Sequence, residues 1–339
     1  VAETMITNNY ADHIYTLSKG ISWITFQNEC AAIRIDDQLC KQGKGITLYS
    51  SFKQNLKGDK IYTVFEDSEG DEWILTNKGI SIIGKKQVDS DFPFQYIKEA
   101  DGIIYLVSQS DKLASYNFKT RQFKFIEIPY HVSMINEVKK FDSNTLLLAT
   151  DNGLIIYKIK EKEFQLIDIR TSTQPSNVVQ SVYQDHYKEL WIFPQTTGVI
   201  RYNPSTKEMQ HLFTPANEVI RYERKNKNVI FEDRQHTLWV LPPEGNLSYY
   251  DRENKELKPM LKDSNNPKSV FSPLVRFYTL DNQGNCWLTS TRGIYKLSFF
   301  PHTYNLVHID NGFETRAFLC DNEKRLWVSS KAQMIRVYQ

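Results

Sequence analysis

Five aspartates are the most regularly placed acidic residues of the sequence, because each stands six residues before a tryptophan; they are Asp67, Asp185, Asp233, Asp281 and Asp321. Carboxylates in pairs could act as general acid and base, as they do in glycoside hydrolysis. Each of these, however, comes just before a turn residue, where an aspartate accepts backbone hydrogen bonds that close a hairpin. We therefore interpret all five as structural and predict no catalytic residue.

Metal-binding and cofactor-binding patterns are missing from the sequence. The seven histidines form no HExxH motif, and GxSxG, P-loop and GxGxxG patterns are absent, so we expect neither a metal nor a cofactor. The cysteines show no CxxC spacing; they are Cys30, Cys40, Cys286 and Cys320. We interpret them as buried free thiols, with disulfides as the alternative for a protein outside the cytosol.

The tryptophans themselves belong to a repeated unit. The copies VFEDSEGDEWILTNKGI and FYTLDNQGNCWLTSTRGI share an apolar stretch, an acid, a turn residue three before the tryptophan and a glycine about six after it. Weaker copies carry tyrosine or leucine in place of the tryptophan. The eight anchors lie 32 to 50 residues apart, a period typical of propellers and arrays; they are Trp23, Trp73, Tyr105, Leu147, Trp191, Trp239, Trp287 and Trp327.

Each copy predicts four antiparallel strands. The anchor lies in a β-branched or aromatic run, and the turn signals on both sides of that run indicate hairpins. No copy has a sustained helical stripe. Four-stranded antiparallel sheets repeated radially form a β-propeller, in which we expect the anchors to fill the space between neighbouring blades. The predicted fold class is therefore all-β, a propeller of four-stranded antiparallel blades.

Composition excludes two classes of function. The 339 residues carry a net charge of +2 and no basic block, which argues against a nucleic-acid partner. No apolar run approaches the length of a membrane span. The 40% hydrophobic and 13% aromatic content is sufficient for the core of a propeller.

The strongest candidate for a binding site is a polar row eleven residues before the anchors: Asp12, Tyr62, Phe94, Asn136, Gln180, Asn228, Arg276 and Arg316. The row nine residues before the anchors is apolar and is expected in the core; it is Ile14, Val64, Tyr96, Val138, Val182, Ile230, Tyr278 and Phe318. Innermost strands line the central channel of a propeller, so we expect the polar row at one mouth of it. The alternative is that a solvated channel simply needs polar walls.

Six members of that row are the predicted ligand-binding residues: Tyr62, Asn136, Gln180, Asn228, Arg276 and Arg316. The amides offer paired donors and acceptors for sugar hydroxyls, and the tyrosine offers a stacking face. A guanidinium forks onto a carboxylate or paired hydroxyls. The row therefore favours a carbohydrate as the ligand. An acidic or sulfated sugar would in addition pair with the guanidinium groups of the two arginines.

The repeat, apolar-x-x-apolar-x-Asp-x-x-Gly-x-x-Trp-apolar-x-Thr-x-x-Gly-apolar, resembles the two-component regulator propeller repeat. The resemblance implies the periplasmic sensor region of a hybrid two-component system of the Bacteroides type, which detects carbohydrate fragments and regulates polysaccharide utilisation. The partners so implied are an oligosaccharide or other glycan fragment, and a second propeller and a homodimer partner in the longer sensor.

The resemblance also implies seven blades, whereas the sequence contains eight copies. We therefore expect residues 1–312 to form a seven-bladed propeller, and residues 313–339 to be an eighth repeat that starts a second propeller or acts as a closing blade. An eight-bladed ring is the alternative.

Two functional hypotheses follow. The first is a propeller that senses a ligand, or that acts as a scaffold for a neighbouring domain, and that is not itself an enzyme. The second is a propeller-type carbohydrate-active enzyme, a lyase or a glycosidase. No acid or histidine departs from the repeat in a paired way, so the sequence favours the first.

Overall fold

A computed structural model gives the fold of most of the chain. The residues it describes are 2–4, 11–26, 30–51, 56–85, 88–89, 93–100, 102–108, 110–117, 120, 122–172, 175–213, 228–241, 247–259, 275–281, 283–290, 293–298, 305–307, 315–323, 325–330 and 335–338. The chain divides into two compact units, one of residues 1–10 with 183–339 and the other of residues 11–182.

The unit of residues 11–182 contains four four-stranded antiparallel sheets and the start of β18. Their strands are β2 Ala11–Thr16, β3 Ile21–Phe26, β4 Ala31–Asp36 and β5 Ile46–Ser50; β6 Ile61–Glu66, β7 Glu72–Thr76, β8 Gly79–Ile82 and β9 Val88–Asp89; β10 Phe94–Ala100, β11 Ile103–Ser108, β12 Leu113–Asn117 and β13 Gln122–Ile126; and β14 Ile135–Asp142, β15 Thr145–Thr150, β16 Gly153–Lys158 and β17 Glu163–Ile167.

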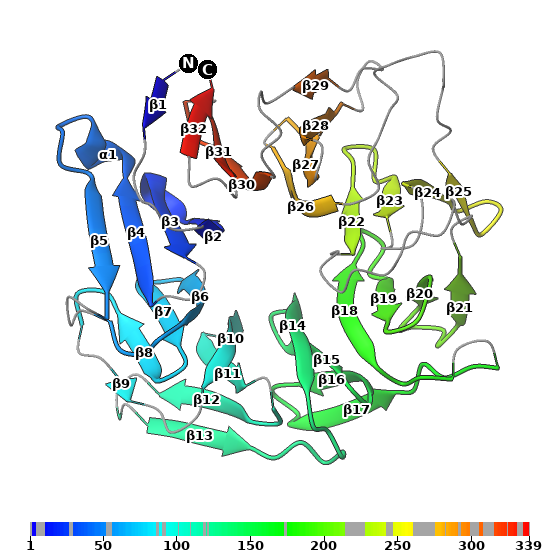
Figure 1. Cartoon of the computed structure of the whole chain (residues 1–339). Helices are drawn as coiled ribbons and strands as arrows, with labels where there is room; N and C mark the ends of the chain where they lie inside the picture. The colour runs from blue at the N-terminus through cyan, green and yellow to red at the C-terminus, as the bar shows by residue number, and fades with distance from the viewer. Residues whose placement is uncertain are drawn as a thin grey trace. The chain divides into compact units, whose positions relative to one another are not determined.

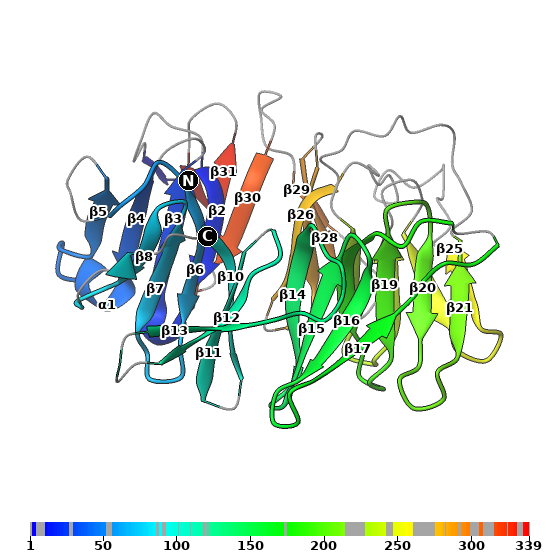
Figure 2. The same cartoon turned by 90° about the horizontal axis from the view of Figure 1, so that it is seen from below.

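The first strands of these sheets lie near one another, with β6 and β14 on either side of β10 (Figure 1). The fourth strand of each sheet lies at the edge farthest from its first strand. Seen from below, strands β14, β15 and β16 stand side by side with the turns at their ends (Figure 2). Two short helical segments interrupt the first sheet, the 3-10 turn Ser18–Gly20 and α1 Asp37–Cys40.

The other unit contains the remaining four sheets. Their strands are β18 Val179–Gln184, β19 Leu190–Pro194, β20 Val199–Tyr202 and β21 Met209–Leu212; β22 Val229–Glu232, β23 Leu238–Leu241, β24 Ser248–Asp251 and β25 Glu256–Pro259; β26 Val275–Leu280, β27 Cys286–Ser290, β28 Gly293–Leu297 and β29 Asn305–Val307; and β30 Thr315–Cys320, β31 Leu326–Ser330, β32 Ile335–Tyr338 and β1 Ala2–Thr4.

The structure confirms the predicted fold class, a β-propeller of four-stranded antiparallel blades. The described strands form eight such sheets, one for each repeat, where the sequence interpretation favoured seven. The last sheet explains the difference. The eighth repeat supplies only β30, β31 and β32, and β1 from the other end of the chain pairs antiparallel with β32 as the fourth strand (Figure 1). The eighth repeat thus shares a sheet with residues 2–4.

The anchors occupy equivalent places in the second strands. Trp23, Trp73, Trp239, Trp287 and Trp327 each pair with the residue eight positions earlier in the first strand. The side chains of the first two are fully buried. Trp73 belongs to a core cluster with Phe94 and Leu106 of the next sheet, which is the predicted packing between blades.

The turn before the anchor has the predicted backbone. The residue three before the tryptophan adopts a left-handed conformation, with φ of 85° at Gly70, 64° at Lys188, 59° at His236 and 78° at Gly284. Glycine reaches this region without steric cost, and the non-glycine residues are held there by the aspartate of the same turn.

Candidate functional site

All five repeated aspartates bind the tryptophan that follows them. The indole Nε1 donates to the aspartate Oδ2 at 2.9 Å from Trp73 to Asp67 and at 3.0 Å from Trp191 to Asp185. The same contact, at 2.9 Å, joins Trp239 to Asp233, Trp287 to Asp281 and Trp327 to Asp321. The other oxygen accepts backbone N–H groups of the turn, as Asp67 Oδ1 does from Glu69 at 3.0 Å and Asp71 at 2.8 Å. The structural interpretation of these carboxylates is confirmed, and the indole contact adds a second partner that turn chemistry alone did not predict.

These bonds lower the pKa of two of the aspartates, Asp281 and Asp321. Burial opposes ionisation of Asp281, but hydrogen bonds from Asn285 and Trp287 outweigh it and lower the pKa of the carboxyl. The pKa of Asp321 is lowered in the same way, against burial, by Trp327 and Arg325. A carboxylate that is held ionised by fixed donors is a poor general acid. The repeated acids therefore belong to the scaffold.

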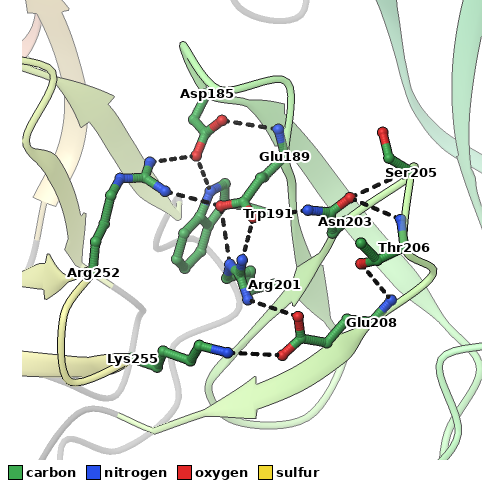
Figure 3. A network of polar contacts seen from close by, with 10 residues as sticks. All are labelled: Asp185, Glu189, Trp191, Arg201, Asn203, Ser205, Thr206, Glu208, Arg252 and Lys255. Carbon is green, nitrogen blue, oxygen red and sulfur yellow. Dashed lines mark hydrogen bonds and ion pairs between the residues drawn. The ribbon is translucent and has the colours of Figure 1, made fainter.

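A larger polar network surrounds Asp185 (Figure 3). Besides Trp191, Asp185 Oδ2 accepts a hydrogen bond from Arg252 Nη2 at 2.7 Å, and Glu189 Oε2 accepts one from Arg252 Nη1 at 2.9 Å. The guanidinium carbon of Arg252 also lies 3.9 Å from the centre of the Tyr187 ring, which is a cation–π distance. Because Arg252 follows β24 while Asp185 and Glu189 belong to the β18–β19 turn, this arginine joins two neighbouring sheets.

The same network continues through Arg201. Its Nε donates to Glu189 Oε2 at 2.9 Å, and its Nη2 bonds Glu189 Oε1. Its Nη1 lies 3.9 Å from Glu208, which forms a second ion pair with Lys255 at 3.3 Å (Figure 3). Burial raises the pKa of Glu189, but the two arginines outweigh burial and lower it overall.

Positive and negative groups balance in this network. The three cations Arg201, Arg252 and Lys255 face the three carboxylates of Asp185, Glu189 and Glu208. Asp185, Glu189 and Arg201 are buried, so removing a partner from one of them would leave a poorly compensated buried charge. The network is therefore a cross-link between sheets.

The predicted polar row coincides with a β-bulge in the first strand. The ladder to the second strand shifts register around Tyr62, Asn136, Arg276 and Arg316, so each of these residues is the extra one in its strand. Asp12 has the same position. A bulge leaves the extra residue out of the ladder and re-aims its side chain, which is why bulges recur beside binding sites.

One assignment in the row was wrong. Phe94 is 1% exposed and lies in the core, and Gln95 holds the bulge instead. Tyr105 pairs with Lys98, seven residues earlier, because the turn between β10 and β11 is one residue shorter than in the other hairpins. Counting back from the anchor therefore selected the neighbouring residue.

Of the three predicted binding residues in the unit of residues 11–182, Tyr62 and Asn136 have clear contacts. Tyr62 is half-buried, and Lys60 Nζ lies 5.9 Å from the centre of its ring. Asn136 already has partners, since its Nδ2 donates to the Val179 carbonyl at 2.8 Å and its own carbonyl accepts from the Tyr96 hydroxyl at 2.5 Å. Asn136 thus connects three first strands.

The other four predicted residues lie at the start of a first strand or directly before it. Gln180 is half-buried in β18, Asn228 is half-buried directly before β22, and Arg316 is half-buried in β30. Arg276 is placed by its backbone in β26, which lies beside β30. Within the unit of residues 1–10 and 183–339, Arg276 and Arg316 hold equivalent bulge positions of adjacent first strands.

A recurrent contact between sheets escaped the sequence analysis. At the end of the first strand, Glu66 accepts hydrogen bonds from the N–H and hydroxyl of Ser18, and Glu99 accepts the same pair from Ser68. Glu232 accepts the His186 N–H at 2.8 Å. The signal was a glutamate seven residues before Trp73 and Trp239, a position that the repeat pattern left undefined.

Reactive groups do not gather elsewhere in the part of the chain that the structure describes. It contains no cluster of three or more histidines, cysteines or acids that could hold a metal. Cys30 and Cys286 are buried as predicted, and burial raises the pKa of both thiols, but Cys40 is exposed. His186 and His236 stack with ring centres 3.7 Å apart on neighbouring turns.

Comparisons with known proteins place the fold. No family model matches the chain. A histidine kinase of Formosa agariphila is 22% identical over 221 residues, which are 61% of this chain and 14% of the kinase. An extracellular domain assigned to a hybrid two-component system of B. thetaiotaomicron has a TM-score of 0.55 at 18% identity, over 82% of this chain and 38% of that chain. The chain shares the fold of that extracellular domain.

Two other solved structures superpose as well. Virginiamycin B lyase of Staphylococcus aureus has a TM-score of 0.53 at 14% identity, over 98% of this chain and 96% of the lyase. Sqt1 of Saccharomyces cerevisiae has a TM-score of 0.70 at 10% identity, over 99% and 97%. At these identities the similarity concerns the fold alone. Among the described residues, no helix combines the length and the apolar character needed to cross a membrane.

Proposed function

We propose that this chain is a propeller of a two-component sensor that lies outside the cytoplasm and binds a carbohydrate fragment without transforming it. The ligand contacts that we propose come from the row at the starts of the first strands, which is Tyr62, Asn136 and Gln180 in the unit of residues 11–182 and Asn228, Arg276 and Arg316 in the other unit. The consequence of binding would be regulation of polysaccharide utilisation through the longer protein. The chain spans 14% of the related kinase, so kinase activity would belong to other parts of such a protein.

The observation that carries this proposal is that the repeated aspartates have the same contacts in each sheet, whereas the residues at the bulges vary. The repeated aspartates are committed to the turns and the indoles, whereas the bulge residues differ in type from sheet to sheet. A scaffold needs the same chemistry in every repeat, but recognition of an asymmetric ligand needs different groups at equivalent positions. Variation at the bulges is therefore the expected mark of a binding surface.

The comparisons support the sensor part of the proposal. The related kinase and the extracellular domain both belong, by their names, to two-component signalling. The location outside the cytoplasm is inferred from that extracellular domain. The carbohydrate is inferred from the amide, guanidinium and aromatic groups of the bulge row.

An enzyme is the second candidate, because the virginiamycin B lyase propeller superposes over most of the chain. Against this candidate stand the five repeated carboxylates, each bound by fixed donors. A lyase or glycosidase would need an acid or base left for the substrate.

A thermal-shift screen against a panel of plant and host oligosaccharides would identify the ligand. Calorimetry would then compare the wild type with the double variant Arg276→Ala/Asn228→Ala and with Arg170→Ala, an exposed arginine outside the row. We expect at least a tenfold loss of affinity in the double variant, about 1.4 kcal/mol, and no loss in the control. Unchanged affinity in a folded double variant would place recognition elsewhere.

A further inference from the structure

Two lysines depart from the repeat at one position of neighbouring sheets. Lys98 of β10 pairs with the anchor Tyr105, and Lys139 of β14 pairs with the anchor Leu147. In five other sheets the residue opposite the anchor is uncharged; these residues are Tyr15, Phe65, Phe231, Thr279 and Leu319. The scaffold therefore does not require a cation at this position.

The two lysines lie in one unit, and the charges of Lys139 and Glu137 both act on Lys98. Strands β10 and β14 lie side by side in the unit of residues 11–182 (Figure 1). Lys139 Nζ forms an ion pair with Glu137 Oε1 at 3.1 Å, while Glu137 Oε2 accepts the Val182 N–H at 3.0 Å. The Tyr96 hydroxyl is engaged with the Asn136 carbonyl. Glu137 is thus shared between a lysine and a backbone donor.

Lys98 has no such partner. Among the described residues, its ammonium makes neither a hydrogen bond nor an ion pair, although the side chain is half-buried. Burial and the nearby charge of Lys139 lower its pKa, and Glu137 opposes them only in part. Two cations therefore lie near the carboxylate of Glu137, which forms an ion pair with Lys139 but not with Lys98, in contrast to the balanced network around Glu189.

We propose that Lys98 and Lys139 form a binding site for an anionic group, a carboxylate or a sulfate, on the first strands β10 and β14. An anion placed between them would pair the ammonium of Lys98, offset the repulsion between the two lysines and replace the water lost on burial. This site lies three residues, roughly 10 Å, along β14 from the bulge at Asn136. A ligand of disaccharide size could reach both.

The inference does not depend on the proposed function, because the probe can be a simple ion. Sodium sulfate would be titrated into the full chain by calorimetry, with sodium chloride at matched ionic strength as the reference. The variants are Lys98→Met and Lys140→Met. Lys140 is the matched control, since it is exposed and directly follows Lys139 in β14. Successive residues of a strand point to opposite faces of the sheet, so the side chain of Lys140 points away from that of Lys139.

We expect saturable sulfate binding by the wild type and by Lys140→Met, and at least a tenfold loss in Lys98→Met. Glucuronate would bind the same proteins, whereas glucose would not compete. Equal sulfate binding by wild type and Lys98→Met, or no saturable binding by the wild type, would overturn the proposal. If the wild type bound sulfate but bound none of the oligosaccharides, that result would count against the proposed function and would leave this site standing.

Discussion

Trp23 Nε1 donates to Glu72 Oε2 at 2.5 Å, from one sheet to the next, whereas the other five tryptophans donate to an aspartate of their own sheet. Position 17, six residues before Trp23, holds leucine, so the first sheet has no aspartate for its indole. Glu72 also accepts hydrogen bonds from Arg34 at 2.8 Å to 3.1 Å. One buried carboxylate thus serves an indole and a guanidinium of the neighbouring sheet.

The first prediction concerns this carboxylate. Glu72→Ala should destabilise the protein by about 3–5 kcal/mol, because the buried Trp23 indole would lose its acceptor and half-buried Arg34 would keep only Asp36 among the described residues, at 3.4 Å. Denaturant unfolding followed by fluorescence measures the change. Glu69→Ala, at an exposed position of the same turn, should stay within about 0.5 kcal/mol of the wild type. Equal stability of the two variants would show that Glu72 is dispensable.

The second prediction separates the two roles of an anchor. Trp73→Ala should cost about 3–5 kcal/mol because it leaves a cavity among Phe94, Leu106 and the other residues of its core cluster. Trp73→Phe keeps much of the ring but loses the bond to Asp67, so a smaller cost of about 1–3 kcal/mol is expected. Calorimetric unfolding of both variants tests this order. A Trp73→Ala variant as stable as the wild type would remove the tryptophans from the core.

The third prediction is a pH dependence. The pKa of Asp281 is lowered in the folded protein, so its ionised form contributes stability above the pKa of the unfolded chain. That contribution is lost as the pH falls through the lowered pKa. Asp281→Asn should therefore be less stable than the wild type near neutral pH, and the gap should close in acid. A gap that stays constant down to the most acidic conditions would contradict this assignment.

The fourth prediction concerns Lys98, whose pKa is lowered in the folded protein. Its protonated form therefore costs stability at neutral pH, and the wild type should gain stability as the pH rises through the lowered pKa. Lys98→Met should raise the melting temperature at neutral pH, with the difference shrinking at high pH. Residues kept for binding often reduce stability in this way. A lower melting temperature for Lys98→Met would instead assign the lysine to the scaffold.

The fifth prediction tests the shared sheet. Ala2, Glu3 and Thr4 pair with Val337, Arg336 and Ile335, so deletion of residues 1–4 should expose the edge of β32. Hydrogen exchange of the β32 amides should accelerate at least about tenfold relative to those of β31. Glu3→Ala leaves the backbone pairing in place and should change nothing. Unchanged protection of β32 in the deletion variant would argue against the pairing.

The repeat pattern predicted the sheets because each copy carries its own turn and strand signals. The aspartate, the left-handed residue and the anchor act within a few residues of one another, so local chemistry was sufficient for Asp67, Gly70 and Trp73. The eighth sheet was harder, since the pairing of β1 with β32 joins residues more than 330 positions apart. No local signal at Ala2–Thr4 specifies that partner.

The positions and contacts of the polar residues were harder to predict from the sequence than the sheets were. The bulges at Tyr62 and Asn136 were found as a row of polar residues, because their spacing from the anchor is fixed by the hairpin. The network of Arg201, Arg252 and Glu189 was missed, since these residues meet only when two sheets pack. Lys98 was hidden by the shorter β10–β11 turn, which moved it out of the counted register.

The central claim is that this propeller binds a carbohydrate fragment and leaves it intact. The most direct test is calorimetry of the full chain against a fractionated oligosaccharide panel, followed by analysis of the recovered sugars for new reducing ends and unsaturated products. The account predicts saturable binding of at least one acidic oligosaccharide, weakened by Arg276→Ala/Asn228→Ala, with every sugar recovered unchanged. Cleaved or unsaturated products, or no binding by any member of the panel, would contradict it.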